Sequence, residues 1–318
     1  RMETSLLKAR LGTSNIQGNL RVDDLAEPNL ICQFNTNLLH TKDLGLQNLE
    51  GEVNLYAVTG QISLEDKLFY IRNLSFILGQ SSFNLSAEVR DWENPKVTAD
   101  LSSPYVKSDD LIWLISLEYP KKDNKTSSPV DLKATLNIND GRISDIDFKK
   151  LYAELRFHKG VLDVETLEAD VFDGKFKSKG KVYVDQGGRN RYETGISIHK
   201  MSLEKIQNYL EMGDRTITGH LSFSGDLSAT GSNADELKQT AAGTFDVQAE
   251  KGVMKKFSVL SKIFSILNVY QLVKFRLPDM AKDGMPYKKI TFHTTLKDGI
   301  FTSNDFFIDS DAIQFSAN

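Results

Sequence analysis

The sequence predicts a mainly β fold: an elongated antiparallel sheet of repeated strand units, interrupted by about three short helices. Two observations predict the strands: apolar and polar residues alternate along many segments, and glycine-containing turns separate these segments at hairpin spacing. A third observation is an internal repeat. Repeats are typical of architectures that present a long surface rather than a single catalytic pocket.

The repeat relates residues 148–179 to residues 287–318 at a constant offset of 139 residues. Both copies begin with an aromatic residue followed by two lysines, and Gly160 and Gly299 mark the same predicted turn. The counterpart of Gly180 would fall one residue beyond the end of the chain. We therefore expect this chain to be a piece of a longer protein.

A looser third copy lies upstream, where Leu74, Phe83 and Val89 match apolar positions of the second copy at an offset of 93 residues and Gly60 matches Gly160. Dipeptides that end in glycine are predicted to form turns between strands. They are Thr59-Gly60, Asp140-Gly141, Lys159-Gly160, Asp173-Gly174 and Asp298-Gly299.

The alternation gives each strand one apolar face and one polar face. An apolar face must be hidden from water, with about 25 cal/mol gained per Å² buried. Either a second sheet packs against it, or a ligand with apolar chains covers it; the residues alone leave both alternatives open. The inward members of the alternating pairs are Val53, Leu55, Ala134, Leu136, Leu155, Phe157, Phe292 and Leu296.

Helices are predicted over residues 108–117, 202–212 and 254–276, the first two beginning at capping serines. The third is apolar around most of its circumference, so it must be buried or rest on lipid. We predict that it packs across the end of the sheet, although a plain capping helix is an alternative. Its trough-facing stripe would be Phe257, Leu260, Phe264 and Leu267, and its basic side Lys255, Lys256, Lys262 and Lys274.

Composition excludes several classes of function. A net charge of −4 gives no electrostatic reason to expect a nucleic-acid partner. Cys32 is the single cysteine, and the five histidines do not occur at metal-ligand spacings. The sequence has no phosphate loop, nucleophile elbow or dinucleotide fingerprint. We predict no enzymatic activity, no cofactor and no metal.

The order of several motifs after about residue 132 resembles the C-terminal region of bacterial AsmA-like proteins. These motifs are Ala-Glu-Leu-x-Phe-x-x-Gly160, Asp173-Gly174-Lys-Phe, Thr218-Gly-x-Leu-Ser-Phe-Ser-Gly225, Ala242-Gly243-Thr-Phe and Asp283-Gly-Met-Pro-Tyr287. We therefore divide the chain into residues 1–130, a repeated β-strand segment of the groove, and residues 131–318, an AsmA-like C-terminal region truncated at its end.

The resemblance implies a sheet that curls lengthwise into a taco-like open groove. It also implies a periplasmic protein, anchored to the inner membrane by an N-terminal segment absent from this chain. The expected activity is a conduit for phospholipid, or another acyl-chain lipid, between inner and outer membrane. The expected partners are this lipid, the membrane surface and envelope proteins. The alternatives are a non-enzymatic scaffold for outer-membrane biogenesis and an extracellular solenoid or adhesin.

Overall fold

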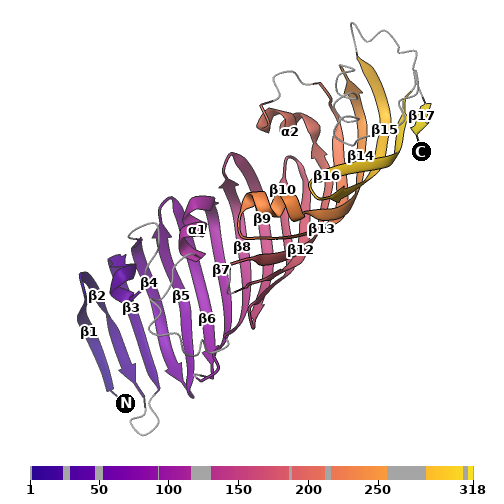
Figure 1. The fold of residues 1–318 in the computed structure, drawn as a ribbon. Helices are drawn as coiled ribbons and strands as arrows, with labels where there is room; N and C mark the ends of the chain where they lie inside the picture. The colour runs from indigo at the N-terminus through magenta and orange to yellow at the C-terminus, as the bar shows by residue number, and fades with distance from the viewer. Residues whose placement is uncertain are drawn as a thin grey trace. The chain divides into compact units, whose positions relative to one another are not determined.

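The computed structural model is mainly β, as predicted, and its strands form open sheets with short helices at their ends (Figure 1). It describes residues 2–23, 29–46, 53–91, 93–115, 130–185, 188–211, 216–255, 284–310 and 314–317. The chain forms two compact units, unit 1 (Arg1–Lys159) and unit 2 (Gly160–Asn318). The predicted division after residue 130 stays a prediction.

Unit 1 is a sheet of nine described strands that pair in chain order. The strands are β1 (Met2–Leu11), β2 (Ser14–Val22), β3 (Leu30–His40), β4 (Asn54–Glu65), β5 (Leu68–Leu78), β6 (Ser81–Arg90), β7 (Lys96–Lys107), β8 (Asp131–Ile143) and β9 (Ile146–His158). A 3₁₀ helix, η1 (Thr41–Leu44), follows β3, and α1 (Ser108–Ile115) follows β7.

Unit 2 repeats this plan with eight described strands, again paired in chain order. They are β10 (Val161–Val171), β11 (Gly174–Tyr183), β12 (Asn190–Ser202), β13 (His220–Gly231), β14 (Ala242–Met254), β15 (Met285–Lys297), β16 (Ile300–Asp309) and β17 (Gln314–Ala317). Helix α2 (Leu203–Tyr209) follows β12, and α3 (Ala234–Thr240) follows β13.

One pairing departs from the predicted antiparallel pattern. Strands β7 and β8 are parallel, with Ala99 opposite Ala134 and Leu101 opposite Leu136. A parallel neighbour requires the chain to return to the starting end of the previous strand. Helix α1 directly follows β7, and the parallel pair makes the sheet of unit 1 mixed.

The predicted repeat is confirmed residue for residue. Strand β15 begins and ends 139 residues after β9, and their turns have positive φ at both central positions: 48° and 77° for Lys159-Gly160, 52° and 77° for Asp298-Gly299. At the offset of 93, β5 and β6 correspond to β10 and β11, with a β-bulge at the same place (Ile71/Leu74 and Val164/Leu167). A β-bulge that recurs at the same position is a structural feature of the repeat and not a defect.

Two predicted turns are wrong, because their glycines lie inside strands. Gly60 lies within β4, which continues to the turn at Asp66-Lys67, and Gly141 lies within β8, which turns at Ser144. Gly141 is opposite Phe148, and a Cβ added to it would come within 2.2 Å of the Phe148 ring. Its missing side chain makes room for an aromatic neighbour. The turn predicted at Asp173-Gly174 lies one residue earlier: Phe172 and Asp173 have φ of 48° and 62°, and Gly174 begins β11.

Two of the three predicted helices are confirmed as α1 and α2. The third, predicted over residues 254–276, lies almost entirely outside the described residues. Helix α3 was not predicted: it has only seven residues and no apolar stripe, and its start is marked by Asn233, whose side chain accepts from the N–H groups of Asp235 and Glu236.

Candidate functional site

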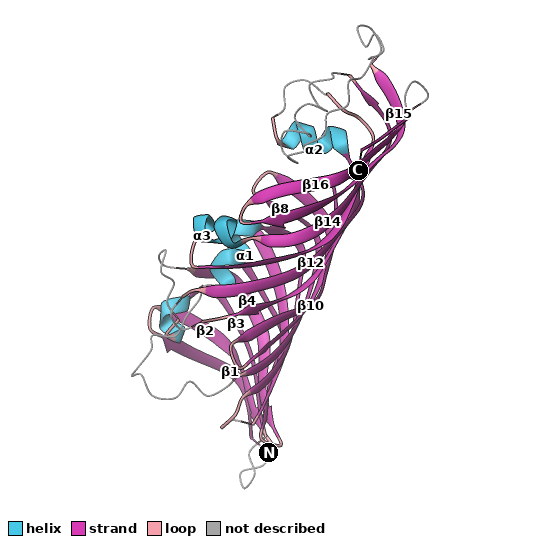
Figure 2. Ribbon diagram, turned by 45° about the vertical axis from the view of Figure 1, so that its right-hand side comes forward, coloured by secondary structure: helices cyan, strands magenta, loops and turns pink. Residues whose placement is uncertain are grey.

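The apolar side chains of unit 1 are most deeply buried at one end of the strands, which we call the capped end. Helices η1 and α1 lie there, and Figure 2 shows α1 on one face of the strands. Phe83, Ile138 and Val106 are each 1% exposed. The other apolar residues buried at or near this end include Leu39, Val53, Leu55, Val58, Phe76, Leu78 and Phe148.

The same hydrogen-bonded latch holds η1 and α1 to a hairpin turn. In the second copy, Asp110 accepts hydrogen bonds from the Gln80 N–H (2.9 Å) and the Ser81 hydroxyl (2.7 Å), and Ser81 Oγ accepts from the Lys107 N–H (2.9 Å). The carboxylate therefore ties the helix after β7 to the turn between β5 and β6.

The first copy has the same latch, 67 residues earlier. Asp43 accepts from the Ser14 hydroxyl (2.7 Å) and N–H (3.0 Å), and Ser14 Oγ accepts from the His40 N–H (3.0 Å). The turn glycines match as well: Gly12 and Gly79 have φ of 56° and 57°, and a Cβ on either would lie 2.1 Å from the latch carboxylate. The sequence reasoning missed this repeat because polar residues carry it.

Away from the capped end, unit 1 carries apolar rows that no described element covers. The lip row runs from β3 to β9, and each member is opposite the next in the strand register: Leu30, Leu64, Phe69, Val89, Val97, Leu132 and Phe157. The alanine row is one step further in: Cys32, Ile62, Ile71, Ala87, Ala99, Ala134 and Leu155. Every member of both rows is half-buried.

These rows form a continuous apolar surface across seven strands, roughly 29 Å wide at about 4.8 Å per strand, which we call the trough. We call the strand ends beyond the lip row the open end. Soluble proteins rarely leave contiguous apolar surface of this extent uncovered, and such surfaces mark binding sites.

The structure divides the predicted lining residues of unit 1 between the two regions. Ala134, Leu155 and Phe157 lie in the half-buried rows, and Leu136, also half-buried, lies one step inward of Ala134. Val53 and Leu55 are 4% and 8% exposed at the capped end, where they fill the core. The alternation alone could not separate these groups, because both have the same period of two.

In unit 2 the corresponding face carries stacked aromatic rings. Phe292, a predicted lining residue, stacks on Phe306 with ring centroids 6.1 Å apart, and Phe223 stacks on Phe245 at 5.1 Å. Leu296, the other predicted residue here, is 7% exposed. Phe257, Leu260, Phe264 and Leu267 lie outside the described residues.

Next to these rings the face of unit 2 carries small and hydroxylated residues. Gly180 is opposite Thr194, and Gly225 is opposite Phe245. The Ser178 and Thr194 hydroxyls are 2.9 Å apart and hydrogen-bonded. The apolar face of unit 2 therefore differs in chemistry from the aliphatic rows of unit 1.

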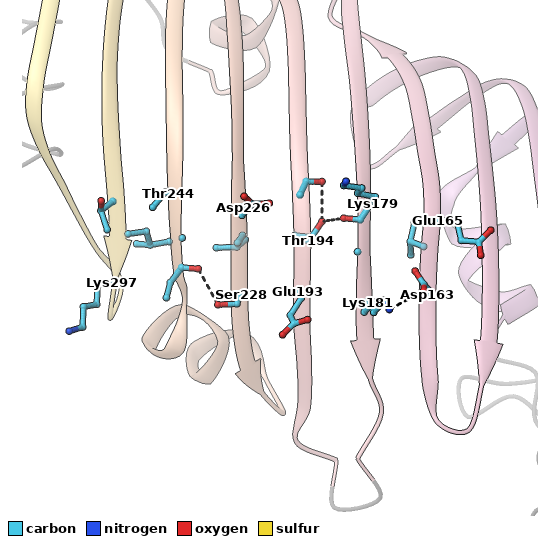
Figure 3. A pocket seen from close by; sticks show the side chains of 18 residues that line it. Asp163, Glu165, Lys179, Lys181, Glu193, Thr194, Asp226, Ser228, Thr244 and Lys297 are labelled. Atoms are coloured by element: carbon cyan, nitrogen blue, oxygen red, sulfur yellow. Dashed lines mark hydrogen bonds and ion pairs between the residues drawn. The ribbon is translucent and has the colours of Figure 1, made fainter.

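Unit 2 also has two adjoining hollows, of about 780 and 490 Å³. They share a row of residues that alternates with the inward positions: Glu165, Lys179, Gly195, Asp226 and Thr244. Figure 3 shows Lys179, Asp226 and Thr244 on β11, β13 and β14 around the larger hollow. Lys179, Asp226 and Thr244 are exposed on the polar surface, although most of the accessible wall of the larger hollow is apolar.

Charged groups on this polar surface are largely paired. On β11, Lys175, Lys177 and Lys181 form ion pairs with Asp170 (2.5 Å), Glu168 (2.7 Å) and Asp163 (3.4 Å) of β10. These exposed pairs each contribute little to stability. No nucleophile-and-base arrangement lies at the hollows.

The predicted surface histidines are exposed. His158 Nδ1 lies 3.7 Å from Asp131, and His293 Nδ1 lies 3.0 Å from Asp246. Within the described ranges, no three His, Cys, Asp or Glu side chains converge into a group that could hold a metal ion. The helices that the structure describes are all too short or too polar to cross a membrane.

Comparison with known proteins assigns the chain to a family. A family model described as YhdP protein matches residues 72–318, most of the chain. The chain belongs to the YhdP family. YhdP proteins are AsmA-like, so the resemblance predicted from the motifs holds at the broader level, and the match begins within β5, well before the predicted boundary at residue 131. Searches of the curated proteins and of the solved structures found no match.

The YhdP family is related to lipid transport and to the cell envelope. A relation to lipid transport makes the apolar rows of unit 1, which continue across seven strands, a candidate lipid-binding surface.

Proposed function

We propose that this chain binds the acyl chains of phospholipid along the lip and alanine rows of unit 1, as part of a periplasmic conduit between the inner and outer membrane. The observation that carries the proposal is the uninterrupted register of half-buried apolar residues across seven strands. Acyl chains would cover this surface and gain about 25 cal/mol per Å² of apolar area removed from water.

Such a surface favours transport over tight storage. Apolar contacts are non-directional, so a chain can slide from one strand to the next without breaking specific bonds. The conduit needs no covalent chemistry, cofactor or metal. A segment outside this chain would anchor it to the inner membrane, and the membrane surface and envelope proteins would be its partners.

The test is native mass spectrometry of the gently purified protein. Wild type should carry phospholipid, and Leu155→Asp with Phe157→Asp should remove most of it, because two carboxylates in the trough would have to be desolvated by the acyl chains. The matched control is Lys133→Asp with Asn137→Asp, two exposed residues that alternate with the inward positions of β8. Both variants must show the wild-type circular dichroism spectrum.

Cys32 gives a second measurement on the wild-type chain, because it lies in the alanine row and is half-buried. Bound lipid should slow its alkylation by a maleimide several-fold, and delipidation should restore the rate. A lipid-free wild-type protein, or equal lipid in folded Leu155→Asp, Phe157→Asp protein, would contradict the proposal and favour the scaffold alternative.

A further inference from the structure

We infer that the two aspartate latches close one lip of the trough in unit 1, so that lipid head groups travel only along the open end. The inference rests on the proposed function and adds a direction to it. It starts from the burial gradient across the strands: apolar residues are nearly fully buried at the capped end and half-buried in the lip row.

The latches have no free polar capacity to offer a head group. Ser14 and Ser81 are 1% and 0% exposed, and each hydroxyl already donates to the latch carboxylate and accepts a backbone N–H. A phosphate forced into this region would lose its hydration without gaining partners, which is strongly unfavourable. The carboxylates of Asp43 and Asp110 would also repel it.

A contact between a helix and a hairpin turn occurs in all three copies. In unit 2 a different bond does the same work: Lys205 of α2 forms an ion pair with Asp173 in the hairpin turn (2.7 Å), and the Ser202 N–H donates to Phe172 O (2.8 Å). Gly174 stands where the other copies have serine, and a Cβ there would meet Met201 N at 2.6 Å. All three copies close the same end of their strands.

At the open end the strand ends border the half-buried lip row and not a buried core. These strand ends and their turns carry exposed charges of both signs, including Asp66, Lys67, Arg90, Asp91 and Lys96. These groups lie beyond Phe69, Val89 and Val97 of the lip row, one or two residues along the chain. An acyl chain on the lip row would therefore place its head group among hydrated charges, where a phosphate can pair with Arg or Lys.

The experiment maps head groups directly on the full chain. Two phospholipid probes are used, one with a diazirine on the head group and one with a diazirine at the end of an acyl chain, and adducts are located by peptide mass spectrometry. Head-group adducts should fall on the turns at Asp66-Lys67 and Arg90-Asp91, at least tenfold above those on Gly79-Gln80 and Ser108-Asp109. Acyl adducts should fall on the two rows.

The second arm opens the latch. Asp43→Asn with Asp110→Asn should raise head-group adducts at the capped end to within two- or threefold of the open end. Asp109→Asn is the matched control, since Asp109 is an exposed neighbour that pairs with Lys107 and does not contact Ser81. If the double variant does not fold, the single Asp110→Asn variant and the wild-type map decide.

The outcomes separate the two claims. No adduct with either probe contradicts the proposed function itself. Acyl adducts on the rows with head-group adducts equally at both ends, or mainly at the capped end, overturn the one-sided lip. A folded double variant with the wild-type pattern shows that the latches do not close it.

Discussion

The apolar faces of the two units are lined by different side chains. Unit 2 carries aromatic side chains on its face: the rings of Phe223, Phe245, Phe292 and Phe306 stack in pairs across neighbouring strands, and glycine at 225 makes room for Phe245. Unit 1 has mainly aliphatic rows with alanine at three consecutive strands, and its own described residues leave these rows half-buried. Unit 2 also keeps half-buried apolar positions in strand register, namely Phe176, Ile198, Phe223, Val247 and Phe292, so the two faces differ mainly in the kind of apolar side chain.

The glycines explain why rings suit unit 2. A Cβ on Gly225 would lie 2.3 Å from Phe245 Cδ1, and one on Gly243 would lie 3.1 Å from Cζ of the same ring. The ring thus lies over two glycines and gains contact that a methyl group would block. Alanines at 87, 99 and 134 keep the rows of unit 1 low and even, as a sliding ligand requires.

The largest effect is expected when a buried ring is removed from the face of unit 2. Phe245→Ala should lower the free energy of opening of β13 and β14 by about 3–5 kcal/mol, since a buried ring leaves a cavity. Leu85→Ala, at a half-buried position on β6 of unit 1, is the matched truncation and should cost only about 1–2 kcal/mol. Native-state hydrogen exchange measures both. Equal losses would mean that the two faces are equally packed.

The next prediction concerns lipid. Saturating phospholipid should slow hydrogen exchange of β5–β9 by an amount that corresponds to about 2.7 kcal/mol at a lipid concentration 100 times the dissociation constant. Amides of β13–β15 should change far less, because Phe245 and Leu296 on their face are already buried. The same samples with lipid-free micelles of a non-ionic detergent serve as control. Protection confined to unit 2 would reverse the comparison.

How much of this could be predicted from sequence depends on which residues carry the pattern. Apolar alternation located Leu155 and Phe157 on the inward face, and the Lys-Lys and glycine positions fixed the 139-residue repeat. The 67-residue repeat escaped because Ser14 and Asp43 are polar, far apart in sequence and joined only by folding. Gly60 and Gly141 were assigned to turns because glycine also serves to admit a neighbouring side chain, a role that only the strand register reveals.

A smaller effect is expected when a small side chain on either face is enlarged. Gly225→Val should destabilise unit 2 by about 1–3 kcal/mol, because its methyl groups would meet Thr244 O and the Phe245 ring. Ala99→Val adds a similar volume to the half-buried alanine row and should cost less than about 1 kcal/mol, while narrowing the trough. Thermal unfolding compares the two, and lipid content is measured for both. A costly Ala99→Val would show that the row is already packed against something.

The smallest expected effect is the pH dependence of the Asp43 latch in unit 1. In unit 1 the Ser14 hydroxyl, together with Thr13, holds the pKa of the Asp43 carboxyl below its ordinary value of about 3.9. Because the folded-state pKa is lowered, the ionised carboxylate contributes stability that is fully present above the unfolded-state pKa and is lost as pH falls through the folded-state pKa. At pH 6, Asp43→Asn should therefore lower the stability of η1. When the pH is lowered to 3, this variant should lose less further stability than wild type.

Hydrogen exchange of the β1–β2 hairpin from pH 6 to pH 3, corrected for the intrinsic exchange rate, measures this loss. Asp109→Asn is the control, because it removes an exposed carboxylate that does not contact a hairpin turn serine. A wild-type β1–β2 hairpin whose protection falls no more than that of Asp43→Asn would show that the carboxylate does not hold the turn. The closed lip would then depend on apolar packing alone, and acidification would leave the route of the head groups unchanged.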